Sequence, residues 1–190
     1  HLRIEDTDKE RSSKEYEQSI LDALTWLGLQ WDGNVVRQSE RVKKYRTALE
    51  ELLSNGKAFY CHHSQEELEE ERKSQEETKQ PPRHICDHKN REEGQKTGGV
   101  IRLVTREGTV VFDDEIRGNI KFEAALLGDF SIARSLDDSL YNFAVVVDDI
   151  DMGITHVIRG EDHISNTPKQ ILIYEALDKE IPKFAHLPLI

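Results

Sequence analysis

The stretch ITHVIRGEDHISNTPKQILIYEAL, residues 154–177, decides the fold of this chain of 190 residues. Its beginning, Ile154 to Ile158, has the apolar content of a buried strand. Pro168 to Leu177 is predicted to be a helix, because proline fits the first turn of a helix. Phe184 to Ile190 then predicts a second strand. Strand, helix and strand in this order are typical of an α/β fold.

The segment just before this stretch, residues 141–152, allows two interpretations. The three valines at positions 145 to 147 favour a strand, since β-branched side chains suit a pleated surface. Side chains at helical spacing favour a helix instead. They are Tyr141, Ala144, Val145, Asp148 and Met152. The local sequence leaves both interpretations open.

Two helices are predicted in the first part of the chain. Residues 13–27 form an amphipathic pattern, with Ser12 and Glu15 at capping-box spacing and Gly28 just past the end. The apolar stripe of this helix consists of Tyr16, Ile20, Ala23, Leu24 and Leu27. A second helix is predicted over residues 40–54, ended by Asn55-Gly56. Its inward side chains are Val42, Tyr45, Leu49, Leu52 and Leu53.

The middle of the chain has a different character. A helix beginning at Ser64, with Glu67 completing a capping box, has almost no apolar face, so we expect it to project into solvent or to meet a polar partner. Pro81-Pro82 ends it. Alternating stretches then predict antiparallel strands at residues 100–104, 109–113 and 119–123. The order of elements predicts an α/β fold whose doubly wound sheet is interrupted by an insertion.

Composition restricts the class of protein. The formal net charge is −11, which argues mildly against nucleic acid as a partner, although local basic groups occur. The commonest role of such groups is a solvated face. No apolar run approaches the roughly 20 residues that span a bilayer, so no membrane partner is expected. Two cysteines make no disulfide framework and no leader precedes His1, so a cytoplasmic setting is expected.

Cysteine and histidine gather between residues 61 and 88, in Cys61-His62-His63 and Cys86-Asp87-His88. Two thiolates and two imidazoles suit tetrahedral Zn²⁺, so a structural zinc site is predicted. The expected ligands are Cys61, His63, Cys86 and His88, with His84 or His62 as substitutes. The alternative is a pair of unligated cysteines beside exposed histidines.

Four segments together resemble the glutamyl-tRNA synthetases, which are class I aminoacyl-tRNA synthetases. They are LRIEDTD at 2–8, YNFAVVVDD at 141–149, the stretch at 154–177 and FAHLPLI at 184–190. The resemblance covers nearly the whole chain, and RGEDH with its flanks is its most specific part. It implies a Rossmann-like catalytic core at residues 1–57 and 133–190. Residues 58–132 would be an α+β insertion that binds the tRNA acceptor stem.

In some bacterial members this insertion contains zinc, although His63 stands where they usually have cysteine. The resemblance further implies ATP-dependent activation of L-glutamate to glutamyl-adenylate, with Mg²⁺ accompanying ATP, and transfer to the 3′ end of tRNA(Glu). The HIGH motif would precede residue 1 and the KMSKS loop would follow residue 190. We therefore expect the 190 residues alone to be inactive, and the intact enzyme to be a monomer.

The substrate site is expected to combine a guanidinium with acidic and hydroxyl groups. Arg159 would bind a substrate carboxylate in a bidentate manner, which separates glutamate from glutamine. By resemblance, Glu5 would receive the α-ammonium and Tyr141 would offer its hydroxyl. The residues expected near ATP are Asp162 and His163, with the backbone of Leu189 and Ile190 at the adenine. No side chain is expected to act as a catalytic nucleophile.

Each of these residues has a structural alternative. Arg159 could form an ion pair that only stabilises the fold, Glu5 could lie in a solvated turn, and Tyr141 could be part of the core. Two other functions fit parts of this sequence. A paralogue that glutamylates a modified base of tRNA, glutamyl-queuosine synthetase, tends to lose the GEDH form of the motif, which is present here. A non-catalytic tRNA-binding fragment would give no ATP–pyrophosphate exchange. The interpretation depends on Arg159 and Glu5 converging on one substrate.

Overall fold

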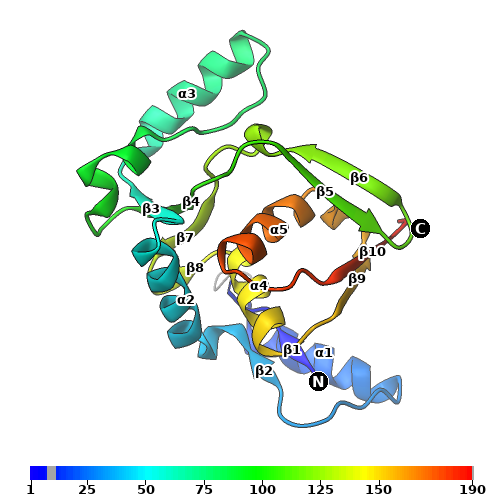
Figure 1. Ribbon diagram of the computed structural model, residues 1–190. Helices are drawn as coiled ribbons and strands as arrows, with labels where there is room; N and C mark the ends of the chain where they lie inside the picture. Colours follow the sequence, from blue (N-terminus) through cyan, green and yellow to red (C-terminus); the bar gives the residue numbers. More distant parts are fainter. Residues whose placement is uncertain (8–11, 190) are drawn as a thin grey trace.

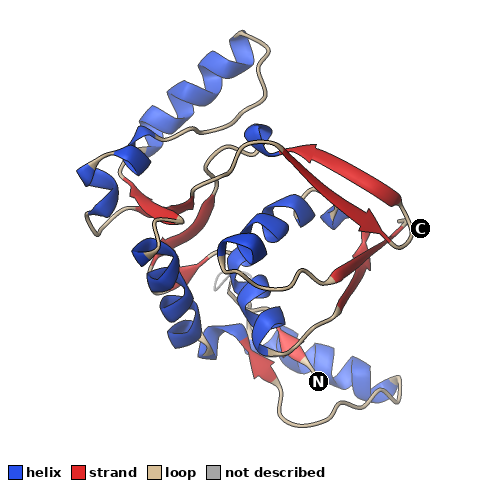
Figure 2. Ribbon diagram, in the orientation of Figure 1, coloured by secondary structure: helices blue, strands red, loops and turns tan. Residues whose placement is uncertain are grey.

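The computed structural model describes residues 1–7 and 12–189. Its strands form one two-stranded and two four-stranded sheets (Figures 1 and 2). Five helices accompany them: α1 (Lys14–Trp26), α2 (Val42–Ser54), α3 (Gln65–Glu77), α4 (Tyr141–Asp151) and α5 (Thr167–Ala176). Short 3₁₀ turns are η1 (Gln38–Glu40), η2 (Asp87–Asn90), η3 (Glu92–Gln95), η4 (Ala124–Leu126) and η5 (Glu161–His163).

The sheet that carries the RGEDH segment has the strand order β6-β5-β10-β9. Strands β9 (His156–Gly160) and β10 (Lys183–Leu187) are parallel and are connected through α5, as the sequence predicts. Strand β5 (Thr109–Asp114) is parallel to β10, and β6 (Gly118–Glu123) pairs antiparallel with β5. The β5–β6 hairpin belongs to the predicted insertion, yet it extends the sheet of the core.

The second four-stranded sheet is antiparallel, with the order β3-β4-β7-β8. Its strands are β3 (Ala58–Cys61), β4 (Val100–Leu103), β7 (Ser131–Ser135) and β8 (Asp138–Ser139). The boundary expected between residues 132 and 133 falls inside β7. In the remaining sheet, β1 (Arg3–Ile4) runs parallel to β2 (Val36–Arg37), with α1 between them in sequence.

Residues 141–151 are helical, which decides the ambiguity that the local sequence leaves open. Every side chain from Phe143 to Asp149 is buried, because α4 packs against α2, α5 and β7. A helix that is buried on nearly all sides carries apolar side chains around most of its circumference, so consecutive apolar residues are compatible with a helix. The valines at positions 145 to 147 therefore indicate burial rather than a strand.

Helices α1 and α3 bury no residue. In α1 the N-cap is Ser13, which accepts a hydrogen bond from the Tyr16 N–H, one residue later than the predicted Ser12. The apolar stripe of α1 is exposed, Tyr16 by 64% and Ile20 by 48%. Helix α3 projects from the antiparallel sheet (Figure 1), and its predicted Ser64–Glu67 capping box is present. Within the described residues, no helix is long and apolar enough to cross a bilayer.

Candidate functional site

Arg159 lies near the carboxyl end of β9, beside β10. In open α/β sheets ligands bind at this end of the parallel strands. The Arg159 guanidinium donates from Nε to His186 Nε2 (3.1 Å) and from one terminal nitrogen to Thr167 Oγ1 (2.8 Å) and Gln170 Oε1 (2.9 Å). It also lies over the Phe184 ring, 5.6 Å from the centroid. Neutral groups of β10 and α5 therefore hold the guanidinium in place.

No carboxylate of the described residues forms an ion pair with Arg159. Burial lowers the pKa of the Arg159 guanidinium, and the charges of Tyr141, Asp149 and Glu5 oppose this effect. A partly buried cation without a close anion is costly. The structural alternative for Arg159, an ion pair within the fold, is therefore absent from the described structure. The arrangement favours an anionic ligand.

Tyr141 connects Arg159 electrostatically with Glu5. Burial raises the pKa of the Tyr141 hydroxyl, the Glu5 charge raises it further, and Arg159 opposes both. The Tyr141 hydroxyl is therefore close enough to both Glu5 and Arg159 to be affected by their charges. Glu5 accepts a hydrogen bond from Arg3 (2.9 Å), whose other terminal nitrogen donates to Asp149 Oδ1 (2.6 Å). The joint role of Glu5 and Arg159 in binding one ligand stays a prediction.

A cavity of about 800 Å³ opens beside Glu5, between β1 and α1. Its lining includes Arg3, Tyr16 and Arg37 but neither Arg159 nor Tyr141. Tyr16 and Ile20, the first two residues of the apolar stripe of α1, line this cavity beside Glu5. Glu5 therefore lines this cavity and also acts electrostatically on Tyr141.

The residues predicted near ATP follow directly after β9. Asp162 and His163 belong to η5, with 3.6 Å between Asp162 Oδ2 and His163 Nε2. A Cβ atom at Gly160 would lie 2.4 Å from Asp162 Oδ1, so glycine permits this close approach. The Leu189 N–H donates to Glu161 Oε1 (3.1 Å), which brings the chain after β10 to the same turn. Ile190 lies outside the described residues.

Sequence reasoning missed two buried groups behind Arg159. His186 and Asp114 are both fully buried, and His186 Nδ1 lies 2.5 Å from Asp114 Oδ2. Burial raises the pKa of Asp114, but hydrogen bonds from His186 and from backbone N–H groups outweigh it and lower the pKa to about 2. The alternation of Val110, Phe112 and Asp114 along β5 was the available signal, because it places a carboxylate on the buried face.

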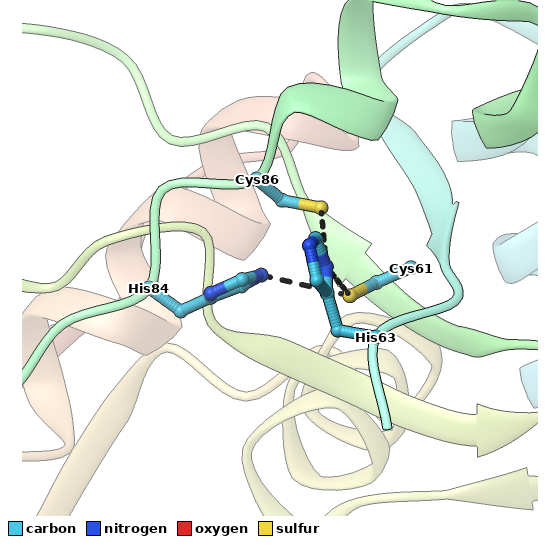
Figure 3. Close-up of side chains that lie close together, drawn as sticks. All are labelled: Cys61, His63, His84 and Cys86. Carbon is cyan, nitrogen blue, oxygen red and sulfur yellow. Dashed lines mark hydrogen bonds between the residues drawn. The ribbon is translucent and has the colours of Figure 1, made fainter. Parts of the chain in front are cut away.

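Four side chains converge at the edge of the antiparallel sheet, as Figure 3 shows. Cys61, His63, His84 and Cys86 each offer one ligand atom, and these atoms all lie within 4.8 Å of one another. The distances are 3.4 Å from Cys61 Sγ to His63 Nδ1, 3.6 Å from Cys61 Sγ to His84 Nε2 and 3.6 Å from Cys86 Sγ to His63 Nδ1. His84, one of the two substitute ligands expected from the sequence, completes this group, whereas the other, His62, has its Nε2 at the Glu93 carbonyl (3.0 Å). His88 lies outside it, although its Nδ1 is 3.4 Å from Cys86 Sγ.

The spacing of these atoms fits a tetrahedral metal. Zn–S and Zn–N bonds of about 2.3 and 2.05 Å at tetrahedral angles separate sulfur from nitrogen by about 3.6 Å. Three of the four sulfur–nitrogen separations, 3.4 to 3.6 Å, agree with this edge length. His84 also contacts Glu71 on α3 through Nδ1 (2.5 Å), the outer contact that orients a histidine ligand. The group can hold a metal ion.

Without a cation, one of the two sulfurs carries the negative charge and the other stays protonated. Burial raises the pKa of Cys61, yet hydrogen bonds from His84 and His63 outweigh it, and its pKa falls to about 4. Burial also raises the pKa of Cys86, and the neighbouring Cys61 adds to that rise. A divalent cation would stabilise both thiolates together.

Comparison with known proteins places this geometry in a family. The family described as "tRNA synthetases class I (E and Q), catalytic domain" matches residues 1–190. A glutamate–tRNA ligase of Nitratidesulfovibrio vulgaris strain DP4 is 47% identical over 190 residues, covering 100% of this chain and 41% of its own length. One from Heliobacterium modesticaldum is 50% identical over 207 residues, with the same two coverages.

A solved structure supports the same relationship. The crystal structure of a glutamate tRNA ligase from Elizabethkingia meningosepticum in complex with its amino acid has a TM-score of 0.88 and 32% identity. It covers 100% of this chain and 42% of its own length, so this chain spans about two fifths of the proteins that it matches. With a family match over every residue and a shared fold, the chain belongs to the catalytic domains of the class I tRNA synthetases for glutamate and glutamine.

Proposed function

We propose that the full-length protein containing this chain activates L-glutamate with ATP and transfers it to the 3′ end of tRNA(Glu). The observation that carries the proposal is Arg159, a partly buried guanidinium held by neutral partners and without an ion pair among the described residues. A carboxylate of the substrate supplies the missing anion. The glutamate–tRNA ligases among the relatives support this choice of substrate.

Each predicted side chain has a separate task. Arg159 binds the side-chain carboxylate of glutamate, and rejects glutamine because an amide leaves the buried charge without its counter-ion. Glu5 receives the α-ammonium, and the Tyr141 hydroxyl lies between the two charges. The residues that meet ATP are Asp162, His163 and the backbone of Leu189 and Ile190, with Mg²⁺ accompanying the phosphates.

The protein contributes position and charge rather than a nucleophile. The α-carboxylate of glutamate attacks the α-phosphorus of ATP, and pyrophosphate leaves. A ribose hydroxyl of the tRNA 3′ end then attacks the glutamyl carbonyl and AMP leaves. Holding the carboxylate next to the α-phosphorus accelerates the reaction, because two bound and oriented reactants no longer have to meet in solution. Residues 58–132 meet the acceptor stem, and the protein works as a monomer in the cytoplasm.

Substitution of Arg159 tests the proposal. In the full-length protein, Arg159→Lys keeps the charge but loses the planar fork, so we expect the KM for glutamate in tRNA-dependent ATP–pyrophosphate exchange to rise about tenfold or more. The KM for ATP should change little. Arg106→Lys is the matched control, because Arg106 makes an exposed ion pair with Glu175. A wild-type protein that gives no glutamate-dependent exchange, or an unchanged KM for glutamate, would contradict the proposal.

We also propose that Cys61, His63, His84 and Cys86 bind a structural Zn²⁺. The tetrahedral spacing of their ligand atoms and the outer contact of His84 with Glu71 support it. Metal analysis of the purified protein should find about one zinc per chain. Cys61→Ser should remove it. Zinc far below one per chain, unchanged by this substitution, would rule out the site.

A further inference from the structure

We propose that Asp114 and His186 are positioning residues that prepare Arg159 for its anionic ligand by fixing which ring nitrogen of His186 carries the proton. The inference deepens the proposed function and rests on it. Asp114 Oδ2 faces His186 Nδ1 at 2.5 Å, and His186 Nε2 faces Arg159 Nε at 3.1 Å. The three groups form one line from β5 through β10 to β9.

The proton positions follow from what each group can do. An arginine Nε is only a donor, so His186 Nε2 must be an acceptor without a proton. The imidazole proton is therefore on Nδ1, where it donates to the Asp114 carboxylate. A proton on Nε2 could be accepted by Thr167 Oγ1, but it would leave the Nε–H of Arg159 without its acceptor. Asp114 thus selects the tautomer that accepts from Arg159.

Asp114 is itself held on all sides. Its Oδ1 accepts the backbone N–H groups of Ile116 (3.1 Å), Arg117 (2.9 Å) and His186 (3.2 Å), while Oδ2 is directed to the His186 ring. The carboxylate is therefore unable to turn without breaking several hydrogen bonds. Its position is set by the β5–β6 turn, so the predicted insertion contributes a group to the predicted substrate site of the core.

His186 also restrains the other partner of Arg159. Thr167 Oγ1 lies 3.1 Å from His186 Nε2 and accepts from the Arg159 terminal nitrogen at 2.8 Å. Gln170 accepts from the same nitrogen and is in turn held by Asn142 (3.0 Å). These contacts use Nε and one terminal nitrogen, and the Tyr141 hydroxyl is a further polar neighbour of the guanidinium. The relay itself does not use the other terminal nitrogen of the guanidinium.

Asp114→Asn is the sharpest test because the backbone fixes the orientation of the new amide. The three backbone N–H groups require an oxygen at the Oδ1 position, so the amide NH₂ takes the Oδ2 position and donates to His186 Nδ1. The proton of His186 then moves to Nε2, against Arg159. Asp113→Asn is the matched control, since Asp113 is exposed and bonds only Asn119 among the described residues.

The first measurement is independent of activity. In the full-length protein with ¹⁵N-labelled histidine, we expect the ring nitrogens of His186 to show a protonated Nδ1 in wild type and in Asp113→Asn, and a protonated Nε2 in Asp114→Asn. A wild-type protein with the proton on Nε2 overturns the inference. This readout stands even if the protein does not activate glutamate, so failure of the relay and failure of the proposed function are distinguishable.

The second measurement uses glutamate-dependent pyrophosphate exchange. Asp114→Asn should raise the KM for glutamate about tenfold or more, because it leaves two buried donors facing each other, with little change in the KM for ATP. Asp113→Asn should match wild type. An unchanged KM for glutamate in a folded Asp114→Asn protein overturns the inference.

A second pair of variants covers the case in which Asp114→Asn does not fold. His186→Gln and His186→Leu both remove the donor to Asp114, but only glutamine retains an acceptor near the position of Nε2. We expect a lower KM for glutamate in His186→Gln than in His186→Leu. Equal values in the two variants would show that Arg159 does not depend on this acceptor.

Discussion

Asp114 has a depressed pKa of about 2, and the stability of the protein should depend on it at low pH. The unfolded carboxyl titrates near its ordinary value of 3.8, so ionised Asp114 contributes stability above that pH and loses it as the pH falls toward 2. The shift corresponds to roughly 2–2.5 kcal/mol. Asp114→Asn has no charge to titrate, so the stability gap between wild type and Asp114→Asn should be largest above pH 5 and shrink below pH 4.

Urea denaturation of both proteins between pH 7 and pH 3 measures this gap. Asp113→Asn provides the comparison, since Asp113 is exposed and its substitution leaves the buried hydrogen bonds intact. A gap between wild type and Asp114→Asn that stays constant over this range would show that Asp114 is not preferentially ionised in the folded protein.

His84 and His88 are the two candidates for the fourth zinc ligand. His84 belongs to the group of converging ligand atoms, whereas His88 contacts only one of its sulfurs. We predict that His84→Ala weakens zinc binding by about tenfold or more, and that His88→Ala weakens it less. Competition with a chromophoric zinc chelator measures both affinities. A stronger effect from His88→Ala would assign the site to the ligand set first expected from the sequence.

Strand β5 is the element that joins the predicted insertion to the core. Phe112 is buried on β5, and its ring lies 5.8 Å from that of Phe184 on β10, whereas the neighbouring Val111 is 51% exposed. Phe112→Ala should therefore lower the free energy of unfolding by about 3–5 kcal/mol, and Val111→Ala by about 0.5 kcal/mol or less. Urea denaturation provides the comparison. Similar losses in the two variants would indicate that the hairpin does not pack on β10.

Local signals predicted some elements well and non-local packing decided the others. The Ser64–Glu67 capping box lies within four consecutive residues, and α3 begins where the sequence predicts. The helical state of residues 141–151 depends on burial by α2, α5 and β7, which no local pattern reports. The pairing of β5 with β10 joins residues 114 and 184, so turn and strand signals predicted both strands but not their contact.

The predicted site shows the same division. Arg159 could be chosen from the sequence because the expected substrate has two carboxylates, and a guanidinium is the side chain that binds a carboxylate in a bidentate manner. Asp114 and His186 act through Arg159, and their contact exists only once β5 and β10 are adjacent. His84 lies outside the regular Cys-x-His spacing of residues 61–63 and 86–88, so spacing favoured His88 while the folded backbone brings His84 to Cys61.

At the scale of the whole molecule, two parts differ in what stabilises them. Helices α2, α4 and α5 share one large apolar core with the strands. Between residues 62 and 99, by contrast, the one buried apolar side chain is Cys86, and it belongs to a small cluster with Phe59, Cys61 and Val104. Segments with so little apolar burial are rarely stable without a metal or a disulfide, and both cysteines are free thiols here.

Removal of zinc should therefore loosen one part of the molecule and leave the other intact. With a strong chelator, we predict faster amide hydrogen exchange in η2 and η3, which contact β3, and in α3, whose Glu71 contacts His84, but unchanged exchange in α4 and α5. Cys61→Ser should show this pattern without chelator and respond no further to it. Uniformly faster exchange would mean that the metal stabilises the whole fold, and unchanged exchange would mean that apolar packing around Cys86 suffices without it.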